Sequence, residues 1–370
     1  MSSQTLQHWD AWSSREECPG DFSVFKTSLV SGLKKLTIEG VENMRIGTIG
    51  SGEIVSNFLN GVKETEGASC GAVYSRSLEK GKALAEKFDI SKVYTDLMEM
   101  MEDEEIDTIY VASPNSLHYE QTKLALEHGK NVICEKPFTT TLEKAKELVL
   151  LAKERNLFLF DAVPPSFLPN FKALKDELSA IGRIRLVMTN YSQYSSRYDS
   201  LLEGKITNVF SKDFAGGCLQ DIGFYNLYFN IAMFGKPVES YYYPNMYPGQ
   251  VDTSGVLVLQ YEDFVSSNVE AKDTWGINYA QIEGEKGYIY VTGGSNGFAE
   301  LKVVTKQGEK TINLQQPVPR FIYEVKEITR IIADKDYSEC HARLDVALDV
   351  IATLENARKS AGIYFSDELQ

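Results

Sequence analysis

The sequence predicts an α/β protein in two parts: an N-terminal doubly wound parallel sheet, then an α+β domain with a large, mainly antiparallel open sheet. Two observations indicate this. Between residues 44 and 164, short apolar segments alternate with helical segments, which is typical of repeated βαβ units. After residue 165, long segments rich in Val, Ile and Tyr are separated by Gly and Asn/Asp turns, which favours hairpin connections.

Strands and helices of the first part follow from the apolar periodicity. The strands are expected at residues 44–50, 68–75, 107–113, 131–136 and 157–163. The helices are expected at residues 53–64, 77–88, 118–129 and 142–156. Ser77 is the expected N-cap of the second helix, and Gly129 ends the third. Thr140 with Glu143 forms a capping box before the fourth.

The second part contains strand-like segments and two closing helices. The strand-like segments span residues 182–195, 238–248, 254–272, 277–294 and 298–314, and the helices span residues 323–335 and 344–362. Because these helices can cover one face of the sheet only, we expect the Tyr-, Val- and Ile-rich opposite face to form a homodimer or homotetramer contact. The expected domains are therefore 44–164 and 165–370, with the closing helices able to pack back on the first.

Composition limits the function classes. The 370 residues are 43% hydrophobic, and 52 acidic against 38 basic residues give a net charge of −14. This balance is typical of a globular protein and argues against a nucleic-acid or anionic-membrane binder, but it does not exclude a small-molecule ligand that is anionic. No apolar run approaches the roughly 20 residues of a membrane span. Five scattered cysteines and isolated histidines predict no disulfide framework, no metal site and a cytoplasmic location.

Residues 1–43 stand apart from this pattern. They contain no continuous apolar core of the signal-peptide kind. We expect a poorly ordered extension or the product of an upstream start. An arm that packs on a partner subunit is the alternative.

A glycine motif ends the first strand. Gly50 and Gly52 fit the first two positions of G-x-G-x-x-G, where one glycine makes the tight turn and the next lets a pyrophosphate approach. Val55 departs from the Gly or Ala of the third position. With Glu53 and Ile54 opening the helix, the segment predicts a Rossmann dinucleotide site, and a plain strand–helix turn is the alternative.

The tip of the second strand bears on the choice of cofactor. Ser75 and Arg76 stand where a carboxylate would hold the ribose of NAD. An arginine beside hydroxyls suits a 2′-phosphate, so NADP is favoured over NAD. A surface arginine at the start of the next helix is the alternative.

Two further strand ends carry polar residues. Residues 113–118 (SPNSLH) and 135–137 (EKP) follow strands whose carboxyl ends should line the ligand crevice. A Glu-Lys pair at the end of an apolar strand is costly unless it has partners or a function. An exposed ion pair is the alternative.

Residues 216–227 (GGCLQDIGFYNL) combine two glycines with an apolar run. If the segment is helical, Asp221 and Tyr225 lie on one face, one turn apart. The pair is then either a helix cap with a core tyrosine or half of an active site.

Together the segments GTIGSGEI, SPNSLH, CEKPFTTT and GGCLQDIGFY, in this order, resemble the Gfo/Idh/MocA oxidoreductase family over about residues 44–365. The resemblance implies hydride transfer between a nicotinamide cofactor, NADP or NAD, and a C–OH/C=O carbon of a sugar, polyol or cyclic diol. A non-catalytic NADP-binding regulator of the same fold is the alternative.

The resemblance also implies roles for the strand ends. Pro114 and Asn115 lie beside the nicotinamide ribose, and His118 starts the next helix near them. Glu135 touches the ribose. Lys136 faces both nicotinamide and substrate.

Hydride transfer at such a carbon needs a group that moves the hydroxyl proton. Family members with a tyrosine at the position of Tyr225 use NADP. A free phenol has a pKa of about 10, and the ammonium of Lys136 is expected to lower it. Tyr225 is thus the expected proton carrier, and Asp221 orients Lys136 or substrate hydroxyls. The family also implies a cis bond before Pro137.

Substrate contacts are expected at three positions. The family often has an Arg-Phe/Tyr-x-Pro-like stretch after its last Rossmann strand, but residues 165–169 contain no arginine. Phe167, Tyr194 and Arg197 are the candidate contacts, and ordinary strand or loop positions are the alternative. The sequence does not choose among substrates.

Overall fold

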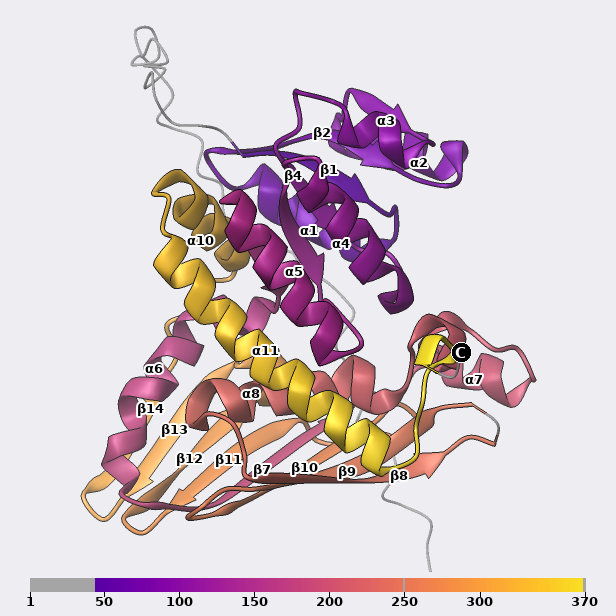
Figure 1. Cartoon of the computed structure of the whole chain (residues 1–370). Helices are drawn as coiled ribbons and strands as arrows, with labels where there is room; N and C mark the ends of the chain where they lie inside the picture. Colours follow the sequence, from indigo (N-terminus) through magenta and orange to yellow (C-terminus); the bar gives the residue numbers. More distant parts are fainter. Residues whose placement is uncertain (1–43, 249, 369–370) are drawn as a thin grey trace, which may run out of the picture. The chain divides into compact units, whose positions relative to one another are not determined.

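The computed structural model describes residues 44–248 and 250–368, so the extension expected at 1–43 lies outside the described residues. Its first sheet, coloured indigo to magenta in Figure 1, is parallel. It has six strands in the order β3-β2-β1-β4-β5-β6. The strands are β1 (Met44–Ile49), β2 (Ala68–Tyr74), β3 (Lys92–Tyr94), β4 (Thr108–Val111), β5 (Asn131–Glu135) and β6 (Leu159–Ala162). The order reverses between β1 and β4, which is where a doubly wound sheet binds its ligand.

Helices connect these strands. They are α1 (Glu53–Lys63), α2 (Leu78–Phe88), α3 (Leu97–Met101), α4 (His118–Glu127) and α5 (Leu142–Arg155). The Ser77 hydroxyl caps α2 as expected. The capping box at Thr140 is wrong, because Thr141 caps α5 by accepting from the backbone N–H of Lys144 at 3.4 Å. The sequence also missed β3 and α3, which are too short to show a periodic pattern.

The second sheet has eight strands in the order β14-β13-β12-β11-β7-β10-β9-β8. The strands are β7 (Ile184–Ser192), β8 (Glu239–Met246), β9 (Asp252–Gln260), β10 (Val265–Ala271), β11 (Tyr279–Gly284), β12 (Gly287–Thr292), β13 (Glu300–Thr305) and β14 (Gly308–Ile312). Neighbouring strands are antiparallel except for β7 and β10, which run parallel. The predicted fold class is therefore confirmed.

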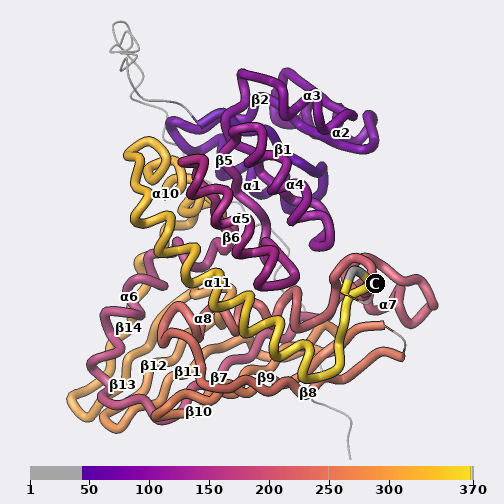
Figure 2. Tube along the Cα trace, viewed as in Figure 1, coloured from indigo at the N-terminus to yellow at the C-terminus, as the bar shows by residue number. Residues whose placement is uncertain are grey.

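Helices lie along one side of the eight-stranded sheet (Figure 2). They include α6 (Pro169–Glu177), α8 (Phe224–Phe234) and α11 (Tyr337–Ser360). Large side chains on the strands are exposed, among them Leu186, Tyr241, Tyr243 and Tyr288. An oligomer contact through this sheet stays a prediction.

The C-terminal helices contact both sheets. The helix α10 (Ile322–Ala333) packs against α1, and α11 contacts α5 and β6 as well as α8 and β8. Val325 and Leu344 join the apolar core of the first sheet, while Val350 and Leu354 join that of the second. The domain boundary at residue 164 stays a prediction. Among the residues that the structure describes, no helix is long and apolar enough to cross a membrane.

Candidate active site

The glycine turn after β1 leaves room at the N-terminus of α1. Gly50 has φ +118°, and a Cβ there would lie 2.8 Å from the carbonyl oxygen of Ala112, so the position requires glycine. A Cβ at Gly52 would meet nothing within 4 Å. The N–H groups of the first helical turn are therefore open to a phosphate. Val55, at the third position of the glycine motif, is buried in the core.

The tip of β2 presents a free arginine. Ser75 is buried, and its hydroxyl lies 3.3 Å from that of Ser51 in the glycine turn. Arg76 is exposed and forms no ion pair within the described part of the chain. A cation beside hydroxyls, next to the phosphate-binding turn, fits a 2′-phosphate.

Loops at the ends of β4 and β5 are tied together by His118. Its Nδ1 lies 2.9 Å from the carbonyl oxygen of Pro137, and its Nε2 lies 2.8 Å from that of Ser113. Both ring nitrogens are thus occupied by backbone. Asn115 donates from its side chain to the carbonyl of Ala215 at 2.9 Å, which joins this edge of the first sheet to the segment before α8.

Glu135 ends β5 in a buried position. Its carboxyl accepts a hydrogen bond from the hydroxyl of Tyr110 at 2.5 Å. Burial raises the pKa of Glu135, although Tyr110 and Lys136 favour its charged form. The Lys136–Pro137 peptide bond that follows is cis.

Lys136, Asp221 and Lys272 form a row of charges. The Lys136 ammonium donates to the backbone carbonyl of Asp221 at 2.7 Å and to its Oδ1 at 3.0 Å. The ammonium of Lys272, just beyond the end of β10, donates to Oδ2 at 2.5 Å. Burial alone would raise the pKa of Asp221, but the two ammonium groups hold it well below its usual range. Asp221 is therefore a carboxylate, and it keeps Lys136 charged.

A π-helical turn places Asp221. The segment 216–227 is helical, but Leu219–Gly223 (η6) forms a π-helix before α8 begins at Phe224. Gly217 has φ +123°, and the side chain of Asp252 accepts from the backbone N–H of Leu219 at 2.7 Å. The turn brings Asp221 and Tyr225 to the same side, as the four-residue spacing predicted.

Tyr225 lies between Lys136 and a cavity. The Lys136 ammonium lies 4.6 Å from the centre of its ring. The cavity has a volume of about 340 Å³ and is lined by Ile54, Asn57, Asn60, Glu135, Pro164, Tyr225, Pro319, Arg320 and Phe321. Among the described residues, the Tyr225 hydroxyl has no hydrogen-bond partner, so it is free to bond a substrate.

Burial determines the protonation state of Tyr225. It raises the pKa of the phenol, while the charges of Lys136 and Arg320 lower it, and the net pKa lies above the ordinary value. The lowering expected from Lys136 is present but is outweighed by burial. Tyr225 is therefore protonated at neutral pH and is prepared to donate its proton.

Sequence reasoning missed Lys272, Arg320 and Asn296. The guanidinium of Arg320 lies 5.8 Å from the centre of the Tyr225 ring. It donates to Asn296, whose side chain donates to the hydroxyl of Tyr191 at 2.7 Å. No local pattern marks these residues, because they are brought together only by the packing of distant loops.

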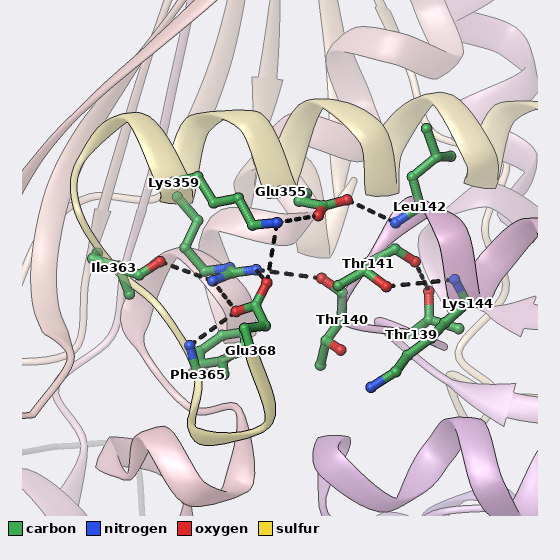
Figure 3. A network of polar contacts seen from close by, with 11 residues as sticks. Thr139, Thr140, Thr141, Leu142, Lys144, Glu355, Lys359, Ile363, Phe365 and Glu368 are labelled. Atoms are coloured by element: carbon green, nitrogen blue, oxygen red, sulfur yellow. Dashed lines mark hydrogen bonds and ion pairs between the residues drawn. The ribbon is translucent and has the colours of Figure 1, made fainter. Parts of the chain in front are cut away.

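A buried network holds the segment that leads from β5 to α5 (Figure 3). Arg358, in α11, donates to the carbonyl of Thr140 at 3.5 Å and pairs with Glu368 at 2.6 Å. The Glu355 carboxylate accepts from the backbone N–H of Leu142 at 2.7 Å. The loop that begins at the Glu-Lys-Pro motif is thus fixed to the last long helix.

The three expected substrate contacts do not line the cavity. Phe167 is buried in the core, with the guanidinium of Arg343 4.3 Å from its ring centre. Tyr194 stacks on Trp275, and its hydroxyl donates to Asp199 at 2.6 Å. Arg197 is exposed in α7 (Ser196–Leu202). A substrate role for these residues stays a prediction.

Two family models match the chain. The model described as "Oxidoreductase family, NAD-binding Rossmann fold" matches residues 44–162, and the model described as "GFO/IDH/MocA C-terminal domain" matches residues 173–290. The two matched segments cover the first sheet and much of the second.

Curated relatives span nearly the whole of the described chain. The scyllo-inositol 2-dehydrogenase (NADP(+)) IolU of Bacillus subtilis (strain 168) is 33% identical over 323 residues, which cover 87% of this chain and 98% of that protein. The trans-1,2-dihydrobenzene-1,2-diol dehydrogenase of Homo sapiens is 27% identical over 311 residues, which cover 80% and 90%.

Solved structures share the fold. KijD10, a 3-ketoreductase from Actinomadura kijaniata in complex with NADP and TDP-benzene, superposes with a TM-score of 0.78 at 21% identity. The match covers 87% of this chain and 99% of that chain.

Proposed function

The chain belongs to the Gfo/Idh/MocA family of NAD(P)-dependent oxidoreductases, and we propose that Tyr225 is its proton carrier, assisted by Lys136. The reaction is hydride transfer between NADP and a C–OH/C=O carbon of a sugar, polyol or cyclic diol. Relatives named as inositol and dihydrodiol dehydrogenases support this substrate class. The observation that carries the proposal is the position of Tyr225: it lines the cavity, its hydroxyl has no hydrogen-bond partner among the described residues, and the Lys136 ammonium lies 4.6 Å from its ring centre.

Three residues have separate roles in the proposed reaction. Tyr225, protonated at neutral pH, donates its proton to the carbonyl oxygen as the carbon accepts a hydride. The Lys136 ammonium stabilises the negative charge that develops on that oxygen. Asp221 holds Lys136 in place through two hydrogen bonds. In the oxidation direction the same phenol, as phenolate, accepts the hydroxyl proton.

The residues present fit NADP as the hydride carrier. The open first turn of α1 would hold the pyrophosphate, and Arg76 with Ser75 would hold the 2′-phosphate. Bound there, the nicotinamide supplies or accepts the hydride. Glu135 lines the cavity and would lie beside the nicotinamide ribose.

The direct test of this function is a turnover screen. Sugars, polyols, dihydrodiols and their ketones are incubated with NADP(H) and NAD(H) in parallel, and absorbance of the reduced nicotinamide is followed. Turnover of at least one compound is expected. A protein that binds NADP(H) and turns over none of them would contradict the proposal.

Arg76→Asp is expected to reverse the cofactor preference. Loss of a charge-assisted bond to the 2′-phosphate and the new repulsion should raise the Kd for NADPH at least about tenfold, with a much smaller change for NADH. Fluorescence titration of both nucleotides measures the two constants. Arg155→Asp, at an exposed position in α5, is the matched control. Equal changes for both nucleotides would refute the assignment.

Lys272→Met is expected to lower kcat about tenfold. With one ammonium gone, Asp221 draws the remaining charge of Lys136 toward itself and away from the substrate oxygen. Lys272→Arg, which retains the charge, should recover part of the rate. Steady-state kinetics separates kcat from KM. An unchanged kcat in Lys272→Met would exclude a positioning role.

We also propose a cytoplasmic location and a homo-oligomer that forms through the eight-stranded sheet. Four cysteines of the described residues are unpaired, which suits a reducing compartment. The exposed tyrosines of β8 and β12 supply apolar surface for the contact. The division into domains 44–164 and 165–370 belongs to the same proposal.

A further inference from the structure

Arg320 adds a positively charged side chain to the cavity that Tyr225 lines. It stands in the loop immediately before α10, and its side chain is exposed rather than buried. Its guanidinium lines the same cavity as Tyr225 and lies over the ring of that residue, 5.8 Å from its centre. A permanent positive charge thus faces the space in front of the proton carrier.

Hydrogen bonds fix the guanidinium in this position. One of its N–H groups donates to the side-chain oxygen of Asn296. The amide of Asn296 donates to the hydroxyl of Tyr191, which donates in turn to Gln193 at 3.0 Å. Tyr191 belongs to β7, so the arginine is held against the second sheet and is not a freely moving surface group.

The charge of Arg320 has no ion-pair partner in the part of the chain that the structure describes. Lys136 and Lys272, the other cations of the site, both bond to Asp221. Asn296 is the one described acceptor for the five N–H groups of Arg320, so the others remain open to a ligand.

Nearby carboxyl groups do not remove this charge. Glu135 and Glu324 are buried, and burial raises the pKa of each, which favours their neutral forms. Lys136 and Lys272 both pair with Asp221, so the charge of Arg320 is a further positive charge at the cavity of a protein whose net charge is −14. A local excess of positive charge in an otherwise acidic protein attracts an anionic ligand to that place.

We propose that Arg320 binds an anionic group on the substrate, a carboxylate or a phosphate, while the reacting carbon faces Tyr225. The inference rests on the proposed function. Within the sugars and polyols proposed there, it favours those that carry an acidic group, namely sugar acids and the phosphates of sugars or polyols. A guanidinium matches both groups, because its planar fork of N–H donors bonds two oxygens at once. The hydroxyl groups of a neutral polyol can accept hydrogen bonds from the guanidinium but carry no charge to pair with it.

The test compares substrates that share a carbon skeleton. D-glucose is set against D-glucuronate and D-glucose 6-phosphate, and myo-inositol against myo-inositol 1-phosphate, each with NADP(H). The wild type should favour a charged member at least about tenfold in kcat/KM. Comparison of kcat/KM for the carboxylate and the phosphate substrates shows which anionic group the site prefers.

Variants assign that preference to Arg320. Arg320→Met should reduce kcat/KM for the charged substrate about tenfold to a hundredfold more than for the neutral member, and this difference should appear mainly in KM. Arg320→Lys should retain part of the preference. Arg330→Met, an exposed arginine on α10 that pairs with Glu327, is the control. If Arg320→Met does not fold, Arg320→Lys and the ionic-strength dependence of KM in the wild type make the same comparison.

Three results would overturn the inference while the proposed function stands. The first is a wild type that favours the neutral member of every set. The second is an equal loss of kcat/KM for charged and neutral substrates in Arg320→Met, which would assign Arg320 to the fold. The third is a rise in the Kd for NADPH in place of the KM for substrate, which would assign Arg320 to the cofactor. Turnover of no compound at all would contradict the proposed function, and the inference with it.

Discussion

Tyr225→Phe is expected to lower kcat at least about a hundredfold, with the Kd for NADPH unchanged. The substitution removes one hydroxyl, the donor that we assign to the substrate oxygen, and retains the ring that packs beside Lys136 and Tyr191. Because that hydroxyl has no partner among the described residues, its loss leaves no buried polar group unsatisfied. Steady-state turnover and fluorescence titration of NADPH give the two quantities.

Tyr228→Phe is the matched control for this variant. Tyr228 lies on the same helix, α8, is buried, and does not line the cavity. Its kcat should stay within about twofold of the wild type, since the group acts on no reacting atom. If kcat of Tyr225→Phe equals that of Tyr228→Phe, Tyr225 is not the proton carrier.

Lys136→Met is expected to lower kcat by two or more orders of magnitude, roughly the contribution of an oxyanion-stabilising donor. The ammonium lowers the pKa of Tyr225, and in the proposed mechanism it also stabilises the developing oxyanion, so its removal should weaken stabilisation and proton transfer together. Asp221 would keep a single partner, Lys272. Substrate KM should change much less than kcat, because the interaction strengthens in the transition state.

Lys123→Met is the control for the loss of a lysine. Lys123 pairs with Glu147 on the surface formed by α4 and α5, away from the cavity. This variant should retain full turnover, since exposed ion pairs contribute about 1 kcal/mol or less to stability. If Lys136→Met also retained it, the charge beside Tyr225 would have no catalytic role.

The fold was predictable where local pattern and tertiary structure agree. The βαβ units of the first sheet were correctly expected, because each main strand is a short apolar run and the helices between them are long enough to show a period, with a cap such as Ser77 marking the start of α2. The three-residue strand β3 and the five-residue helix α3 were missed, since they span too few residues to show a period. Thr140 was mistaken for the cap of α5 because Thr141 stands beside it.

The candidate site was predictable in part. Residues on one helical turn, such as Asp221 and Tyr225, have a spacing that sequence shows directly. Lys272 reaches Asp221 because the end of β10 packs against η6, and no local signal in the sequence predicts that contact. Arg320 enters the cavity because α10 packs on α1, a contact between segments more than 250 residues apart.

The sequence also did not predict the direction in which the pKa of Tyr225 shifts. The motif indicated a lysine beside the phenol and hence a lowered pKa, but burial is a property of the whole fold and outweighs that charge. The protein is consequently suited at neutral pH to donate a proton in reduction. Oxidation, which needs the phenolate, should gain rate as the pH rises.

The pH dependence of single-turnover hydride transfer, with saturating NADPH and the best ketone or aldehyde substrate, tests the role of Tyr225 most directly. Since the protonated phenol is the donor, the wild-type rate should stay level through neutral pH. It should fall only as the pH passes the raised pKa, above about 10. Tyr225→Phe should react at least about a hundredfold more slowly and lack that descending limb. A variant that keeps both the rate and the limb would contradict Tyr225 as the proton carrier.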